Sequence, residues 1–117
     1  MNHLRKITIA VSTVLLICST VGAVDWPQFR GPTRNGQSSE TGLMKSWPEG
    51  GPKELWSFEG LGQGYASIAV ADGLVYTTGM VGSDGILFAF DLNGNLKWKV
   101  NYGPEWTGDK PGTRTTP

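Results

Sequence analysis

Three turn signals divide residues 65–98 and constrain the fold more than any other feature of the chain. Asp72-Gly73, Ser83-Asp84-Gly85 and Asn93-Gly94 each stand between apolar or β-branched runs. Asp-Gly and Asn-Gly in such positions are strong signals for tight hairpins. They predict a four-stranded antiparallel meander, with a longer loop at residues 79–85. The predicted strands are residues 67–70, 74–78, 86–90 and 96–100.

The third and fourth of these strands differ in their pattern. Residues 86–90 are apolar without alternation, which predicts that both faces of this strand are covered, because successive side chains point to opposite faces of a sheet. In the fourth strand, apolar and charged residues alternate as Leu96, Lys97, Trp98, Lys99 and Val100. This strand is expected to be half exposed, and its lysines would protect an outer edge against further pairing.

A single sheet with two apolar faces needs a layer against each side. The β-propeller supplies such layers by repetition, because its four-stranded blades pack face to face. Leu55-Trp56 and Leu96-Lys97-Trp98 stand in similar predicted strands, and the two tryptophans are 42 residues apart. This spacing lies within the roughly 40 to 50 residue period of propeller blades. We therefore predict an all-β chain holding four-stranded antiparallel blades of an incomplete β-propeller.

The predicted propeller portion covers residues 52–117. It begins with an outer strand at residues 53–58, continues through one blade at residues 65–100, and reaches the start of the next blade at residues 113–117. The chain is thus expected to stop at a blade boundary, as a truncated reading frame would. Because repeat units need about three copies for stability, the isolated chain is expected to associate.

Residues 1–23 have the layout of a secretory signal peptide. Arg5 and Lys6 precede an apolar stretch, and Val21-Gly22-Ala23 fits the small-residue cleavage rule. We predict cleavage after Ala23 and export to the periplasm or cell surface, with no stable membrane span afterwards. A retained membrane anchor is the alternative. Lipid attachment at Cys18 is disfavoured, because the bulky Ile17 stands where a small residue is expected.

Residues 24–51 sustain neither the strand nor the helix period. The segment is rich in proline, glycine and polar residues, with aromatic side chains at Trp26, Phe29 and Trp47. We predict an extended N-terminal lead-in that these aromatic residues anchor to a core formed elsewhere. Arg30 and Arg34 lack the glycine-rich strand-to-helix context of an anion site and are interpreted as solvated loop residues.

Composition excludes several function classes from residues 24–117. The only histidine is His3 and the only cysteine is Cys18, so the later residues offer no Cys/His zinc site, no Ser-His or Cys-His nucleophilic pair and no disulfide framework. The formal net charge of the whole chain is zero. No basic field is therefore available to attract nucleic acid.

Three stretches resemble the PQQ-like β-propeller repeat proteins, a family of exported bacterial propellers. The first opens the lead-in as Asp25-Trp26-Pro27-Gln28-Phe29-Arg30-Gly31-Pro32, the second is Gly51-Pro52-x-x-Leu55-Trp56, and the third is Ala89-Phe90-Asp91-Leu92-Asn93-Gly94-x-x-x-Trp98. The third is similar to the tryptophan-docking motif of quinoprotein propellers, but one residue shorter between Asp91 and Gly94. Together the three stretches are spread over residues 25–98 of the chain.

Four residues of the third stretch form the predicted structural blade motif. Ala89 leaves room on a packed face, Asp91 and Gly94 set a tight turn, and Trp98 places its ring against the neighbouring blade. We assign no catalytic, cofactor-binding or metal-binding residue. The partners expected are further propeller blades, other copies of the chain, or a protein or small-molecule ligand that the sequence does not identify.

The lack of histidine and cysteine after residue 23 and the shorter motif favour a non-catalytic binding or scaffold module on an exported propeller. One alternative is the N-terminal part of a PQQ-dependent quinoprotein dehydrogenase, whose PQQ and calcium would be held by blades outside this chain. Another is an outer-membrane assembly adaptor that resembles the propeller lipoprotein of that machinery. The shorter motif and the missing cysteine pair weigh against the dehydrogenase, and Ile17 weighs against the lipoprotein.

Overall fold

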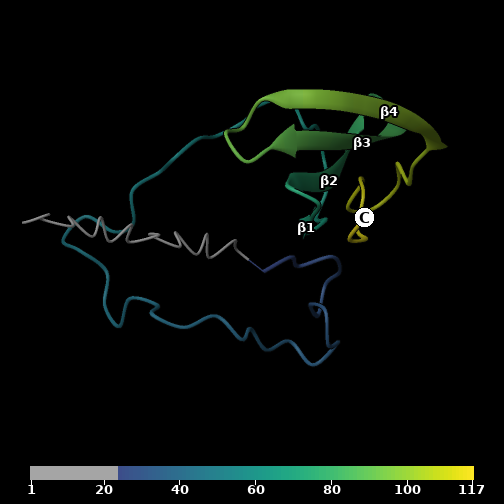
Figure 1. Cartoon of the computed structure of the whole chain (residues 1–117). Coiled ribbons are helices and arrows are strands. Elements are labelled where there is room, and N and C mark those ends of the chain that lie inside the picture. The colour runs from purple at the N-terminus through teal and green to yellow at the C-terminus, as the bar shows by residue number, and fades with distance from the viewer. Residues whose placement is uncertain (1–23) are drawn as a thin grey trace, which may run out of the picture.

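A computed structural model of the 117-residue chain describes residues 24–117 (Figure 1). The predicted signal peptide of residues 1–23 lies outside the described part. The described residues contain four strands and no helix. The strands are β1 (Ala69–Ala71), β2 (Leu74–Val81), β3 (Asp84–Asp91) and β4 (Leu96–Pro104).

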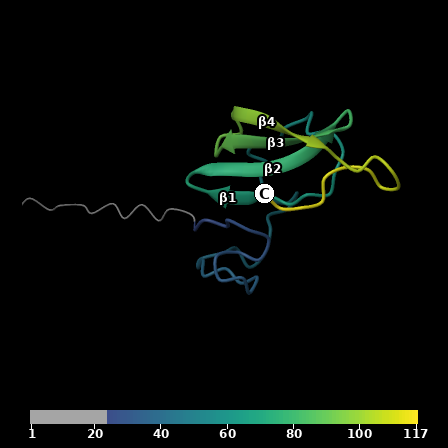
Figure 2. The same ribbon diagram turned by 90° about the vertical axis from the view of Figure 1, so that its right-hand side faces the viewer.

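The four strands form one antiparallel sheet in the order β1-β2-β3-β4 (Figure 2). The predicted all-β class and four-stranded meander are therefore confirmed. The sheet is open, with β1 at one edge and β4 at the other. At the first hairpin, Asp72 and Gly73 both take positive φ values, 50° and 74°. This pair matches the type I′ turn that suits the twist of antiparallel strands.

The predicted loop over residues 79–85 is wrong. β2 continues through Gly79 to Val81, and β3 begins at Asp84, so that Gly82 and Ser83 alone form the turn. Gly79 is a glycine for another reason, because a Cβ at this position would collide with the carbonyl oxygen of Leu61. Glycine inside a strand often marks such a close approach of another backbone.

The hydrophobic core lies on one face of the sheet. Val75, Phe88 and Phe90 are buried there, and Trp56, Phe58 and Leu61 pack against them from outside the sheet. Val75 lies opposite Phe90 in the β2–β3 register, so both side chains project to the same side. We call this side of the sheet the covered face.

Residues 53–58 do not form the predicted outer strand. They cross the covered face and contribute side chains to it, and their backbone pairs with none of the strands among residues 24–117. A strand needs a neighbour whose backbone groups are free. The aromatic side chains Trp56 and Phe58 of this segment therefore pack onto the sheet, although the segment is not a strand of it.

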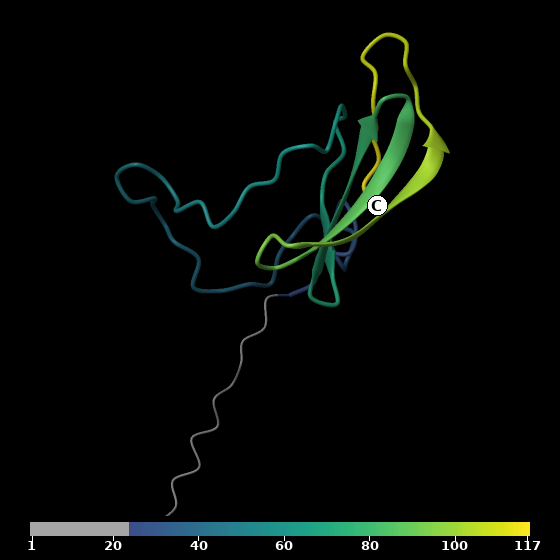
Figure 3. The same cartoon turned by 90° about the horizontal axis from the view of Figure 1, so that it is seen from above.

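The lead-in of residues 24–51 has no regular structure and extends to one side of the sheet (Figure 3). Trp26 alone of its aromatic residues is attached to the sheet, through paired backbone hydrogen bonds with Val70 of 2.8 and 2.9 Å. Phe29 and Trp47 are 73% and 65% exposed. The predicted anchoring is thus made by backbone pairing at one position, and the other two aromatic residues anchor nothing in the described chain.

The C-terminal segment returns to the β1 edge after a loop beyond β4 (Figures 2 and 3). Thr113 forms a single parallel bridge with Gly64, and the hydroxyls of Ser67 and Thr116 lie 2.6 Å apart. Residues 113–117, predicted to start a further blade, form no strand. The β1 edge is thereby flanked by segments near both ends of the described chain.

Candidate functional site

The turn between β3 and β4 is organised by the carboxylate of Asp91. Its Oδ1 accepts hydrogen bonds from the backbone N–H groups of Asn93 (2.9 Å) and Asn95 (3.0 Å), and its Oδ2 accepts one from Asn95 Nδ2 (3.0 Å). The Asn95 side chain, together with these backbone donors, lowers the pKa of Asp91. An aspartate that accepts backbone hydrogen bonds in this way is a common device for fixing a tight turn.

Gly94 completes this turn, and the indole of Trp56 packs against it. Its φ of +83° favours glycine, and a Cβ built on it would lie 2.6 Å from the Trp56 ring. Trp56 Nε1 also donates a 3.1 Å hydrogen bond to the carbonyl of Leu92 in the same turn. The turn of the predicted blade motif is therefore the docking point for a tryptophan that lies 38 residues before Gly94 in the sequence.

The sequence identified Trp56 as a repeat of Trp98 and as part of the second PQQ-like stretch, but predicted no contact for its ring. In the structure the indole of Trp56 packs against the turn glycine, Gly94. The same ring also contacts Phe90, with ring centroids 6.0 Å apart. Phe58 continues the contact, because its ring meets that of Phe90 edge to face at 4.7 Å and that of Phe88 at 6.1 Å. Such tilted aromatic pairs are favoured by the ring quadrupole.

The opposite side of the sheet is apolar but lacks this cover, and we call it the open face. The register places Tyr76, Ala89 and Trp98 side by side across three strands, and Leu87 beside Val100. Ala89 is fully buried, and its small side chain lies between the larger ones. The Tyr76 and Trp98 ring centroids are 5.9 Å apart.

The exposure of β4 is greater than its alternating pattern predicts. Trp98 is 42% exposed, and Val100 and Tyr102 are each 49% exposed. The lysine side of the strand is exposed as well. β4 thus presents apolar side chains to solvent on the open face, whereas half exposure would have required them to be covered.

Tyr102 lies at the end of the open face beside the β2–β3 turn. Its ring packs on the backbone of Gly85, where a Cβ would collide with it, and its hydroxyl donates to the carboxylate of Glu105. Partial burial of the phenol, reinforced by the hydrogen bond and negative charge of Glu105, raises the pKa of Tyr102 to about 12. In the folded chain Tyr102 therefore stays protonated at pH values above the ordinary pKa of a phenol.

The described residues offer no metal site and no membrane-crossing helix. Among residues 24–117, no three side chains of the His, Cys, Asp or Glu type cluster closely enough to hold a metal ion. The same part of the chain contains no helix with the length and hydropathy of a transmembrane span. At the predicted blade motif the structure brings together aromatic packing and hydrogen bonds.

Comparisons of the chain with models of protein families, with curated proteins and with solved structures found no match. The resemblance to PQQ-like repeat proteins accordingly remains a prediction that rests on the three sequence stretches. The described residues themselves form a sheet with one covered face and one open face.

We predict that Gly94→Ala destabilises the chain more than Gly73→Ala. The two glycines occupy hairpin turns with similar φ values, +83° and +74°, but a Cβ on Gly73 meets nothing within 4 Å. Gly73→Ala should cost about 1–2 kcal/mol for its backbone conformation, and Gly94→Ala a further ~1–3 kcal/mol because it displaces the Trp56 indole. Urea denaturation of dilute chain measures both values, and equal losses would show that the indole does not rest on Gly94.

We also predict that one tyrosine titrates near pH 12 and that Tyr102→Phe removes this transition. The raised pKa means that the folded state holds this proton more tightly than the unfolded state does. The associated stabilisation is complete below pH 10, the ordinary phenol value, and is lost as the pH rises toward 12. Tyrosinate absorbance follows the transition, and Glu105→Gln should move it toward 10; an unshifted midpoint in Glu105→Gln would contradict the assigned contact.

Proposed function

We propose that the chain is a sheet module of an exported β-propeller that acts as a non-catalytic binding or scaffold protein. In this proposal the open face packs against a neighbouring sheet. The observation that carries the proposal is the asymmetry between the two faces: aromatic side chains of the same chain close one face, while Trp98, Val100 and Tyr102 stay exposed on the other.

The contacts of Trp56 suggest how a neighbouring sheet would be engaged. Trp56 rests on a turn glycine and donates its indole N–H to a carbonyl in that turn. Trp98 stands in the corresponding sequence context, 42 residues later, and it is 42% exposed on the open face. By this analogy Trp98 would dock on the turn glycine of the next sheet, and each sheet would hold its neighbour through one tryptophan.

The gain from such docking is large enough to matter. A tryptophan or tyrosine ring buries ~150–250 Å² when fully covered, which corresponds to roughly 4–6 kcal/mol at about 25 cal/mol per Å². Trp98 and Tyr102 are each about half covered already, so each retains roughly half of this amount for a partner. Two such rings and Val100 could hold a second sheet in place.

The export part of the proposal rests on the sequence of residues 1–23 and places the protein in the periplasm or at the cell surface. Its non-catalytic part rests on the lack of cysteine and histidine after residue 23. Adding PQQ and Ca²⁺ to a purified full-length product that includes any further blades separates this hypothesis from the dehydrogenase alternative. The proposal expects no change in absorbance beyond the sum of the components, and a new bound-quinone band would contradict it.

We predict that the full chain self-associates in solution when no neighbouring sheet is present, and that Trp98→Ala weakens this association. The matched control is Trp106→Ala, because Trp106 is 59% exposed but lies in the loop after β4 and in none of the four strands. Analytical ultracentrifugation at several concentrations measures the effect. Residues 1–23 are common to all variants, so the difference between variants reports on the open face.

Two results would contradict this docking proposal. One is a wild-type chain that stays monomeric as its concentration is raised. The other is an equal loss of association in Trp98→Ala and Trp106→Ala, which would show that exposed indoles stick without regard to the sheet.

A further inference from the structure

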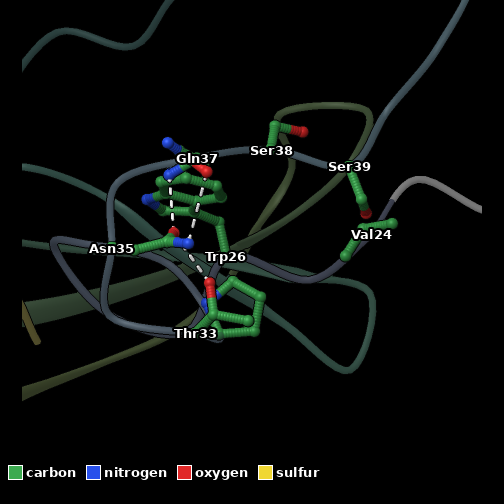
Figure 4. Close-up of a pocket in the computed structure, with 8 residues that line it drawn as sticks. Val24, Trp26, Thr33, Asn35, Gln37, Ser38 and Ser39 are labelled. Carbon is green, nitrogen blue, oxygen red and sulfur yellow. Dashed lines mark hydrogen bonds between the residues drawn. The ribbon is translucent and has the colours of Figure 1, made fainter.

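The lead-in forms a pocket of about 230 Å³ that lies outside the sheet faces (Figure 4). It is built from one continuous stretch of the chain, folded back on itself by turns at residues 28–36. The side chains that line it are those of Val24, Trp26, Pro32, Thr33, Asn35, Gln37, Ser38 and Ser39. One wall is therefore apolar, and the remainder carries hydroxyl and amide groups.

The apolar wall is held rigidly. Trp26 is tied to β1 by the two backbone hydrogen bonds with Val70. Its ring packs on Gly31, whose φ is +73° and where a Cβ would lie 2.7 Å from the indole, and its Nε1 donates to the carbonyl of Phe29 at 3.4 Å. The indole is thus fixed at its backbone, at one ring surface and at its N–H group.

The polar side is held by a chain of hydrogen bonds (Figure 4). Thr33 Oγ1 donates to Asn35 Oδ1 at 2.7 Å. Asn35 Oδ1 also accepts a hydrogen bond from the backbone N–H of Gln37 at 2.9 Å. Asn35 Nδ2 in turn donates to Gln37 Oε1 at 3.4 Å. These bonds orient both amides before any ligand arrives, and they leave donors on the Gln37 amino group and acceptor lone pairs on the Thr33 hydroxyl.

The chemistry of the lining selects the kind of ligand. In the full chain no lining residue is ionised at neutral pH, because Val24 is joined to Ala23 by a peptide bond. A phosphate, carboxylate or ammonium group would therefore lose its hydration without gaining a counter-charge. Amide and hydroxyl groups pair instead with neutral hydroxyls, and the indole offers a surface for C–H groups. The volume is smaller than the roughly 300–1,000 Å³ of pockets for drug-sized molecules, which suits a ligand of one ring.

We propose that this pocket binds one neutral sugar ring, with its hydroxyl groups on the Asn35, Gln37 and Thr33 side and its C–H groups against Trp26. Because the lining is already ordered, binding costs little conformational entropy. Because the pocket is shallow and open to solvent, the affinity is expected to be weak. The site goes beyond the sheet module described above and does not depend on the open face.

Saturation-transfer NMR on the full chain tests the proposal, with methyl glucoside and methyl galactoside as probes. Transfer should be observed for at least one of them and be strongest at ring C–H protons. Trp26→Ala should abolish it. Gln37→Ala, which removes an exposed side chain and leaves the backbone pairing of Trp26 intact, should weaken it roughly fivefold, the effect of losing about one hydrogen bond. Trp106→Ala, which changes an exposed tryptophan outside the pocket, should leave it unchanged.

Several outcomes would overturn the assignment. These are the absence of transfer to either glycoside, transfer that persists unchanged in both Trp26→Ala and Gln37→Ala, and equal transfer to glucuronate, whose carboxylate the lining should reject. Competition by a proline-rich peptide without any glycoside binding would likewise show that the pocket serves another class of ligand. None of these results bears on the association of the open face, so the two proposals fail separately.

Discussion

The contact of Trp56 and Phe58 with Phe88 and Phe90 is the interaction on which the rest of the structure depends. A four-stranded sheet in water exposes both of its faces, and a sheet this small needs packing against at least one of them to persist. Here the cover comes from an unpaired segment of the same chain that crosses the sheet. Its position is fixed at one end by the turn glycine Gly94 and at the other by the close approach of Leu61 to Gly79. Glycine at these two positions admits the crossing segment.

Closing one face leaves the chain asymmetric, and this asymmetry organises the remaining surfaces. The β1 edge is flanked by Trp26 and by the C-terminal segment around Thr113, whereas β4 is exposed along nearly its whole length. Lys97 and Lys99 disfavour further strand pairing at the β4 edge. The proposed association would therefore use the open face, because aromatic and aliphatic side chains could pack there without extending the hydrogen-bond ladder.

The sequence predicted local structure well and non-local contacts poorly. Strand number, order and two of the three turns followed from the turn residues Asp72-Gly73 and Asn93-Gly94, because hairpins are local and their residues have specific backbone preferences. Gly79 was misread as a loop residue, because a glycine that opens a turn and one that admits a neighbouring backbone look identical in sequence. The docking of Trp56 on Gly94 joins positions 38 residues apart. The turn already explains a glycine with positive φ at position 94, so nothing in the sequence indicated that Gly94 also makes room for an indole. The pocket beside Trp26 is formed by turns in a segment without strand or helix periodicity, so no sequence pattern predicted it.

Hydroxyl-radical footprinting by mass spectrometry, on chain dilute enough to be monomeric, tests most directly whether one face is closed and the other open. With each side chain normalised to its oxidation in the unfolded chain, Phe90 should be protected and Trp98 labelled, in keeping with their exposures of 2% and 42%. Phe58→Ala should expose Phe90 and leave the labelling of Trp98 unchanged. Labelling of Phe90 at the unfolded level in the wild-type chain, or protection of Trp98 in the monomer, would contradict the account.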